Sequence, residues 1–361
     1  MAILKQTYFL PLLMAMAMGM TSCYSEFDPK IDSTPVLCMN STITPGEPVT
    51  LFLTRTWSWT EGYEQDLDLN VRDAEVLLIV NGEYKETLKQ TVIHNPDYPY
   101  DPYPEKRECY QSEYHPKSGD VIRLEATSAQ YGEATADVEV PYPVPIDRIE
   151  VRDIHCKTYG DISGFPAVRD RCEFALDFNV LAYFTDPNGS SNYYELKSGT
   201  SSYRNYDGEA EAEFIDYPWI DYSGEPLLTE HVSELDSTIA DTSGYTIFSD
   251  RQINGRTYPL RIGFRQSVFL YQNPLNLPGP KETGITVVLR HLDSTYYKHV
   301  MSVWEGNDGI VGALGGLGLA SAVYPYSNVS TRAGVVVAFA EASLTIPVLD
   351  VIALAEEGNF K

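Results

Sequence analysis

The sequence lacks the motifs that most enzyme classes need. It contains neither a Gly-x-Ser-x-Gly nucleophile elbow nor a His-Glu-x-x-His metal helix. The glycine-rich run at 312–320 has no Gly-Lys-Ser/Thr to complete a phosphate-binding loop, so we interpret it as backbone that turns or packs closely. His291 and His299 are too far apart for an i, i+4 metal pair, and we interpret both as structural. We therefore predict no enzyme activity and no cofactor.

Basic residues are scarce, which limits the partners of the chain. There are 26 Lys and Arg residues against 51 Asp and Glu residues, and the formal net charge is −25. A nucleic-acid-binding protein needs a basic surface that displaces counterions from phosphates, and no basic stripe is present here. The same charge argues against binding to acidic lipid headgroups. We expect no nucleic acid partner and a well-solvated surface.

Long apolar segments are absent after the first 22 residues, which resemble a bacterial lipoprotein signal peptide. Lys5 supplies a positive charge, residues 8–20 are apolar but short, and Thr21-Ser22 precede Cys23. We predict that the signal is cut before Cys23 and that this cysteine is acylated; an ordinary cleaved signal is the alternative. An acidic tether, 23–34, would follow, so the lipid anchor would be the only contact with the membrane.

Cysteine is rare, and four cysteines remain when the predicted lipidation site is set aside. No Cys-x-x-Cys occurs, which argues against a zinc knuckle or a thioredoxin-type redox site. An even number of cysteines in an exported protein suggests two disulfides, although free buried thiols are possible. Three pairings can be drawn, and we favour the two bonds that each stay within one proposed domain, Cys38–Cys109 and Cys156–Cys172.

The sequence contains many short segments in which apolar and polar residues alternate, as in β-strands. Alternating segments and the Asn81-Gly82 turn predict an immunoglobulin-like sandwich over residues 35–141. The proline-rich segment 141–147 cannot be a central strand and is expected to be a hinge. Further strands predict a larger antiparallel β-domain over 146–361. The fold class is therefore all-β.

One short helix is expected within the C-terminal domain. Asp293 or Ser294 can cap its first turn, and Gly306 can end it in a left-handed conformation. Its apolar face carries four residues at helical spacing, which we interpret as core packing: Tyr297, Val300, Met301 and Trp304.

Two long loops are predicted at 86–118 and 201–243. No Lys or Arg occurs between Asn205 and Asp250, so the second loop is strongly acidic. Oxygen-rich loops can bind calcium, but the spacing of an EF-hand is absent, and we interpret the segment as a solvated loop. Exposed aromatic residues next to carboxylates are suited to binding a carbohydrate, a peptide or a partner protein. The alternative is that these rings pack the loops onto the surface of the domain. The candidate binding residues are Tyr217, Trp219 and Tyr222.

Several segments together resemble one known family. They include FTDPNGSSNYYEL at 184–196 and IFSDRQINGRTYPL at 247–260, and the similarity extends over nearly all of the chain after Cys23. The chain resembles the outer-membrane lipoprotein family of Bacteroidota catalogued as domain of unknown function four-two-four-nine. The resemblance implies a two-part β protein that is usually encoded beside a TonB-dependent outer-membrane transporter. It implies no known enzyme activity and no ligand-contact residues.

These observations favour a lipid-anchored protein of the outer membrane, at the cell surface or facing the periplasm. Its expected role is an accessory or ligand-capture subunit of a TonB-dependent transporter. A structural pilin or adhesin-like surface subunit is the alternative. It is weakened because the first arginine, Arg55, lies in a predicted strand and not in a cleavable N-terminal segment. A hydrolase is the least favoured class.

Overall fold

The computed structural model describes residues 34–57, 68–94, 106–159, 171–206, 209–215, 220–229, 246–271, 284–307 and 320–347 except 322, together with residues 312, 314, 350, 351 and 354. Pro35–Trp57 and Tyr63–Lys361 form one compact unit, which holds every described residue except Thr34. The fold is all-β, as the sequence predicts, and its strands form three sheets among the described residues.

The N-terminal strands belong to two sheets that share one hydrophobic core, in agreement with the predicted sandwich. Alternate residues such as Leu37 and Met39 are fully buried, because a period of two places them on the inner face. The turn at Asn81 (φ 55°) and Gly82 (φ 82°) has the left-handed geometry expected of Asn-Gly. In sheet order, the strands are β1 (Leu37–Ile43), β2 (Thr50–Arg55), β6 (Lys106–Gln111) and β5 (Lys89–His94), facing β4 (Glu83–Thr87), β3 (Glu75–Val80), β7 (Val121–Ser128) and β8 (Gly132–Glu139).

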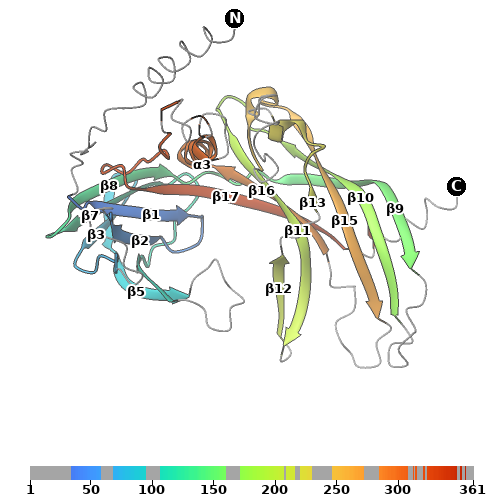
Figure 1. Cartoon of the computed structure of the whole chain (residues 1–361), viewed down its shortest axis with the longest axis horizontal. Helices are drawn as coiled ribbons and strands as arrows, with labels where there is room; N and C mark the ends of the chain where they lie inside the picture. Colours follow the sequence, from blue (N-terminus) through green and yellow to red (C-terminus); the bar gives the residue numbers. More distant parts are fainter. Residues whose placement is uncertain are drawn as a thin grey trace, which may run out of the picture. The chain divides into compact units, whose positions relative to one another are not determined.

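The last strand, β17 (Gly334–Pro347), is shared by the N-terminal and C-terminal strands (Figure 1). Its first residues, Gly334 to Ala338, pair in parallel with β1, and from Phe339 onward it pairs with β16 (Gly284–Leu292) in antiparallel fashion. Val336 and Ala338 are fully buried or nearly so in the sandwich core. Residues far beyond the predicted boundary at 141 therefore complete that core.

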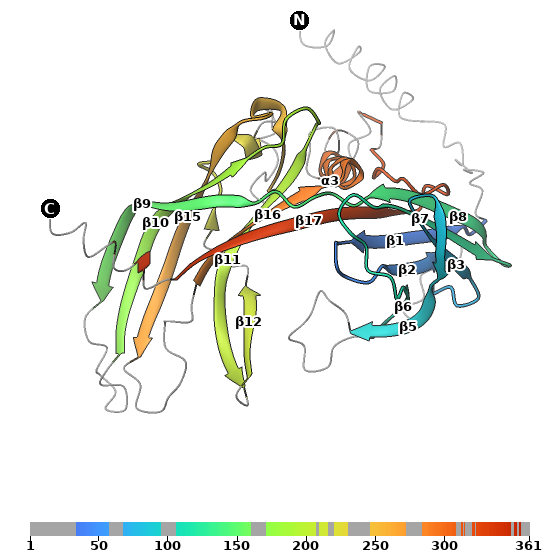
Figure 2. The same cartoon turned by 180° about the vertical axis from the view of Figure 1, so that it is seen from behind.

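The C-terminal region contributes the second large core. β11 (Tyr193–Tyr206), β12 (Glu209–Ile215) and β14 (Ile247–Ser249) extend the β16–β17 sheet. A separate sheet has the order β13–β15–β10–β9, and its strands β15, β10 and β9 lie side by side in Figure 2. Apolar residues from both sheets form one buried cluster, which includes Phe184, Tyr194 and Leu289. The strands of the separate sheet are β13 (Ile220–Asp221), β15 (Thr257–Tyr271), β10 (Arg171–Thr185) and β9 (Ile146–Tyr159).

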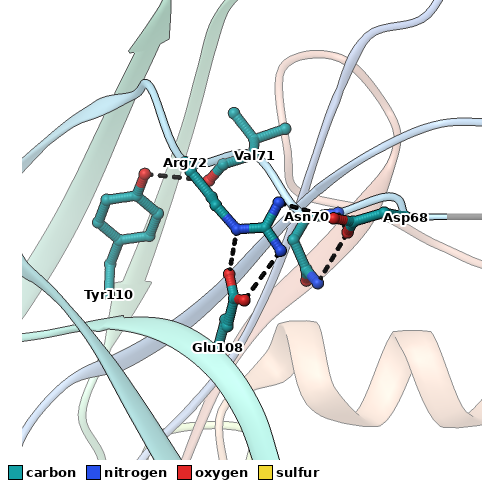
Figure 3. Close-up of polar contacts among 6 residues, drawn as sticks. All are labelled: Asp68, Asn70, Val71, Arg72, Glu108 and Tyr110. Carbon is teal, nitrogen blue, oxygen red and sulfur yellow. Dashed lines mark hydrogen bonds and ion pairs between the residues drawn. The ribbon is translucent and has the colours of Figure 1, made fainter.

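Polar contacts attach the segment 68–72 to β6 (Figure 3). Arg72 donates to both carboxylate oxygens of Glu108, at 2.6 and 2.8 Å, and to Asp68 at 2.6 Å. The hydroxyl of Tyr110 donates to the Val71 carbonyl at 3.0 Å. Arg72 is about half exposed, so this cluster is a surface ion pair and adds little stability. Its effect is to hold residues 68–72 against β6.

The predicted helix is present as α3 (Ser294–Asn307). The Asp293 carboxylate caps it by accepting from the backbone N–H groups of Thr295 and Tyr296, at 2.6 and 3.3 Å. The expected end at Gly306 is wrong: α3 continues to Asn307, and Gly306 is not among the glycines with a positive φ. Among the described residues, no helix is long and apolar enough to cross a membrane.

The two predicted long loops contain regular strands. β5 and β6 lie within 86–118, and the acidic segment 201–243 begins with a hairpin of β11 and β12. In β12, Glu209, Glu211 and Glu213 alternate with alanine or phenylalanine, which is the period-two pattern of a strand. The high charge obscured that pattern, because an acidic segment by composition alone is typical of a loop.

Candidate functional site

The two segments that carry the family resemblance meet in one buried hydrogen-bond cluster. Asp186, directly after β10, accepts from the Tyr194 hydroxyl at 2.6 Å and from the Gly255 N–H at 2.9 Å. Asp250 begins the short helix η3 (Asp250–Gln252) and accepts from Asn254 Nδ2 at 2.9 Å. The two aspartates are only 2% and 4% exposed. We call this the Asp186–Asp250 cluster.

The side-chain amide of Asn192 joins the two carboxylates. Its Nδ2 lies 3.2 Å from Asp186 Oδ1 and 3.4 Å from Asp250 Oδ2, and it also meets the carbonyls of Pro187 and Ser190 at 3.1 and 3.3 Å. Four oxygens therefore surround an amide that carries two hydrogens. The cluster is closed to solvent, so its evident role is to hold the ends of β10, β11 and β14 together.

His291 packs beside this cluster and is also structural, as the sequence predicts. Its ring stacks on Tyr194 with centroids 5.3 Å apart, and its Nδ1–H donates to the Tyr142 carbonyl at 2.8 Å. Burial lowers the pKa of His291, which favours the neutral ring. Burial and the neighbouring Asp186 raise the pKa of Tyr194, so its hydroxyl remains a donor.

A different arrangement lies on the β13–β15–β10–β9 sheet, where the structure has an open cleft of about 540 Å³. Its volume falls within the usual range for ligand pockets. The described residues include no group of three or more His, Cys, Asp or Glu side chains that could hold a metal ion. The polar residues that line the cleft come from all four strands: Asp153, His155, Asp177, Asn179, Asp221 and Arg265.

A β-bulge in β9 shapes one side of the cleft. His155 pairs with Asp177 and Arg152 pairs with Asn179, so two residues of β9, Asp153 and Ile154, occupy the space opposite one residue of β10. Asp153 has a φ of 53°, which is unusual for a residue other than glycine. Its carboxylate accepts from Asn179 Nδ2 at 3.0 Å. The bulge thus redirects one acidic side chain toward the cleft.

Gly263 in β15 leaves the centre of the cleft open. A Cβ atom placed there would lie 3.3 Å from the Cβ and carbonyl oxygen of Asp221 and 3.7 Å from Oδ1 of Asn179. Below this sheet face, the buried rings of Phe178 and Phe264 stack at 5.4 Å and support the two central strands. A side chain at position 263 would therefore press on Asp221 and fill the hollow between Asp221 and Asn179.

The wall formed by β13 is held by a buried carboxylate that the sequence did not single out. Glu225 is fully buried, and it accepts from the Tyr258 hydroxyl at 2.8 Å and from the Arg261 N–H at 2.7 Å. Its Oε1 also accepts from the Leu227 N–H, at 3.0 Å, at the start of η2 (Pro226–Thr229). Glu225 is one acidic residue among many in its segment, so only its burial reveals its role.

The predicted binding residues are only partly described. Tyr222 follows β13, packs against the C-terminal core and exchanges a hydrogen bond with Ser198 at 2.7 Å, so much of its ring is used for packing. Tyr217, Trp219 and Cys23 lie outside the described residues. Asp221, next to Tyr222, lines the cleft, and hydrogen bonds from Ser223 lower the pKa of its carboxyl.

The predicted disulfide between Cys38 and Cys109 is wrong for this structure, which contains both as free thiols. The physical reason is that β2 lies between β1 and β6. Two strand spacings separate the cysteines by about 10 Å, beyond the roughly 7 Å that a disulfide allows between Cα atoms. Burial raises the pKa of the Cys109 thiol.

The other predicted bond involves Cys156 and Cys172, whose side chains lie outside the described part. The backbone register pairs Cys156 with Leu176, which is four residues from Cys172. Four residues of extended strand span about 13 Å. A bond between these cysteines would therefore need a different register at this end of β9 and β10.

A comparison with protein families matches most of the chain. The family model described as a domain of unknown function (DUF4249) matches residues 24–343. A comparison with curated proteins finds no match. The matched range contains the Asp186–Asp250 cluster and every residue of the cleft. The chain therefore belongs to the DUF4249 family.

Proposed function

We propose that this protein is a lipid-anchored, extracytoplasmic binding protein that serves a TonB-dependent transporter of the outer membrane as an accessory, ligand-capture subunit. The export segment ending at Cys23 supports the anchor, and the family resemblance supports the transporter as partner. The observation that carries the proposal is the open cleft of about 540 Å³ on the four-stranded sheet β13–β15–β10–β9.

The lining of the cleft favours binding over catalysis. It includes no Ser, Thr, Cys or Lys side chain among its described residues, so hydroxyl, thiol and amine nucleophiles are missing from that lining. The carboxylates of Asp153 and Asp177 already accept hydrogen bonds from Asn179 and Arg265. Groups that are held by each other in this way present a fixed surface for a ligand.

The experiment is to tag the chain at its C-terminus in its native host and purify it from detergent-solubilised outer membranes. We expect a TonB-dependent transporter to co-purify in comparable amount, and palmitate to label the protein. Cys23→Ala is the matched variant, and it should leave the membrane fraction and lose the label. If the wild-type protein is recovered without any transporter, the accessory role is refuted.

A further inference from the structure

We propose that the cleft binds a neutral polyhydroxylated ligand, that is, a saccharide. This inference rests on the proposed ligand-capture function and specifies its ligand class. Three features of the described lining support a saccharide: its hydrogen-bonding groups, their charges and the hollow beside Gly263.

The cleft presents donors and acceptors side by side. Arg265 meets Asp177 with its Nε and Nη2 both 3.3 Å from Oδ2, and Asn179 meets Asp153 at 3.0 Å. Each pair combines a planar carboxylate with a planar group that has further N–H hydrogens to donate. A hydroxyl both donates and accepts, so two neighbouring hydroxyls of a sugar can bind a carboxylate and an adjacent N–H group together.

The charges of the lining disfavour two other ligand classes, anions and cations. Three carboxylates line the cleft and the whole chain has a net charge of −25, which disfavours an anion. The guanidinium of Arg265 already occupies the position beside Asp177 where a ligand ammonium would bind. Asp153 accepts from Asn179 and Asp221 accepts from the Ser223 N–H, so each carboxylate of the described lining already has a donor, which makes a cation less favoured. The polar lining also offers little to a purely apolar ligand, because polar groups left without partners on binding cost free energy.

The space fits a ligand that lies flat on the sheet. Gly263 contributes no side chain, and Asp221 and Asn179 stand on either side of the resulting hollow. A pocket of about 300–1,000 Å³ is typical of small-molecule sites, and this cleft is within that range. β13 forms the adjacent wall, and Glu225 fixes it to β15. The hollow is thus built from backbone that is held in place, which suits recognition of a rigid ring.

The test uses the mature full-length chain on an array of neutral and charged glycans, followed by calorimetric titration with a neutral oligosaccharide that it retains. Trilysine peptide is titrated as the cationic probe. Gly263→Leu fills the hollow, and Asp177→Asn weakens one donor–acceptor pair without filling it. Asp137→Asn is the matched control, because Asp137 is equally exposed and pairs with Arg123 at 3.1 Å on a sheet outside the cleft.

We expect binding of a neutral oligosaccharide that changes little as salt is raised. Asp177→Asn should weaken it about tenfold or more, corresponding to roughly 1.4 kcal/mol, Gly263→Leu should abolish it, and Asp137→Asn should leave it unchanged. The inference is overturned if no neutral glycan is retained, if trilysine binds instead with steep salt dependence, or if Asp177→Asn binds the sugar normally. Gly263→Leu is interpreted only if its circular dichroism matches the wild type. Co-purification of the transporter with Asp177→Asn tests the proposed function separately.

Discussion

Gly334 stands at the start of β17, where this strand first meets β1. Its φ is +80°, and a Cβ atom there would lie 2.2 Å from the Met39 carbonyl oxygen and 2.7 Å from the Met39 carbonyl carbon. Gly82 has nearly the same φ, +82°, but a Cβ atom there would meet nothing within 4 Å. The two glycines therefore separate the effect of backbone conformation from the effect of close packing.

Substituting each glycine with alanine should give unequal losses of stability. The left-handed conformation costs about 1–2 kcal/mol for a residue other than glycine, and both variants bear that cost. Gly334→Ala must also push β17 away from β1, which disturbs the 3.2 Å hydrogen bond from Met39 N–H to the Ala333 carbonyl and the burial of Val336. Overpacking of this kind costs about 1–3 kcal/mol more. We expect Gly334→Ala to lose about 2–5 kcal/mol in total, adding the two ranges.

The assay is urea denaturation of the full chain, followed by tryptophan fluorescence and far-ultraviolet circular dichroism. The quantity compared is the free energy of unfolding of each variant relative to the wild type. If Gly334→Ala and Gly82→Ala lose the same free energy, the close approach of β17 to β1 is not a constraint. The claim that β17 completes the sandwich core would then lose its main energetic support.

Three further substitutions test the buried polar groups. Glu225→Gln places an N–H₂ group near N–H and O–H donors, so the free energy of unfolding should fall by about 1–3 kcal/mol. An unchanged urea midpoint would contradict the role of Glu225 in holding β13 to β15. Asn192→Asp adds a third carboxylate beside Asp186 and Asp250 and removes the amide that donates to both. Its free energy of unfolding should therefore be about 3–5 kcal/mol lower than that of the wild type. Rescue of that variant and stabilisation of the wild type by calcium would instead identify a metal site. Burial lowers the pKa of His291 in the folded state, so on acidification this histidine takes up a proton in the unfolded state first. The free energy of unfolding that the neutral His291 contributes is therefore present above about pH 6.5 and is lost as the pH falls below that value. The His291→Asn variant should therefore lose less stability than the wild type between about pH 7 and pH 5.5 in thermal melts, and equal losses would show that this histidine does not carry the effect.

The sequence by itself determined the local features of this protein. Asn81-Gly82 forms its hairpin because the turn depends on two adjacent residues that accept positive φ angles. Asp293 caps α3 because the groups it bonds lie two and three residues away. The all-β class followed in the same way, since strands such as β1 and β7 alternate buried and more exposed residues with a period of two, which is a local pattern. The motifs of the family resemblance were also visible, although their role was not.

Only the tertiary structure decided which distant segments meet. The first residues of β17 pair with β1, about 300 positions away, and the rest pair with β16, about 50 to 60 positions away. No local pattern encodes such pairings. The same holds for Cys38 and Cys109, because the position of β2 between their strands decides that they cannot bond. The cleft, too, arises where a bulge in β9, a glycine in β15 and a two-residue strand converge. Each of these is an ordinary local feature, and packing alone brings them together into a site.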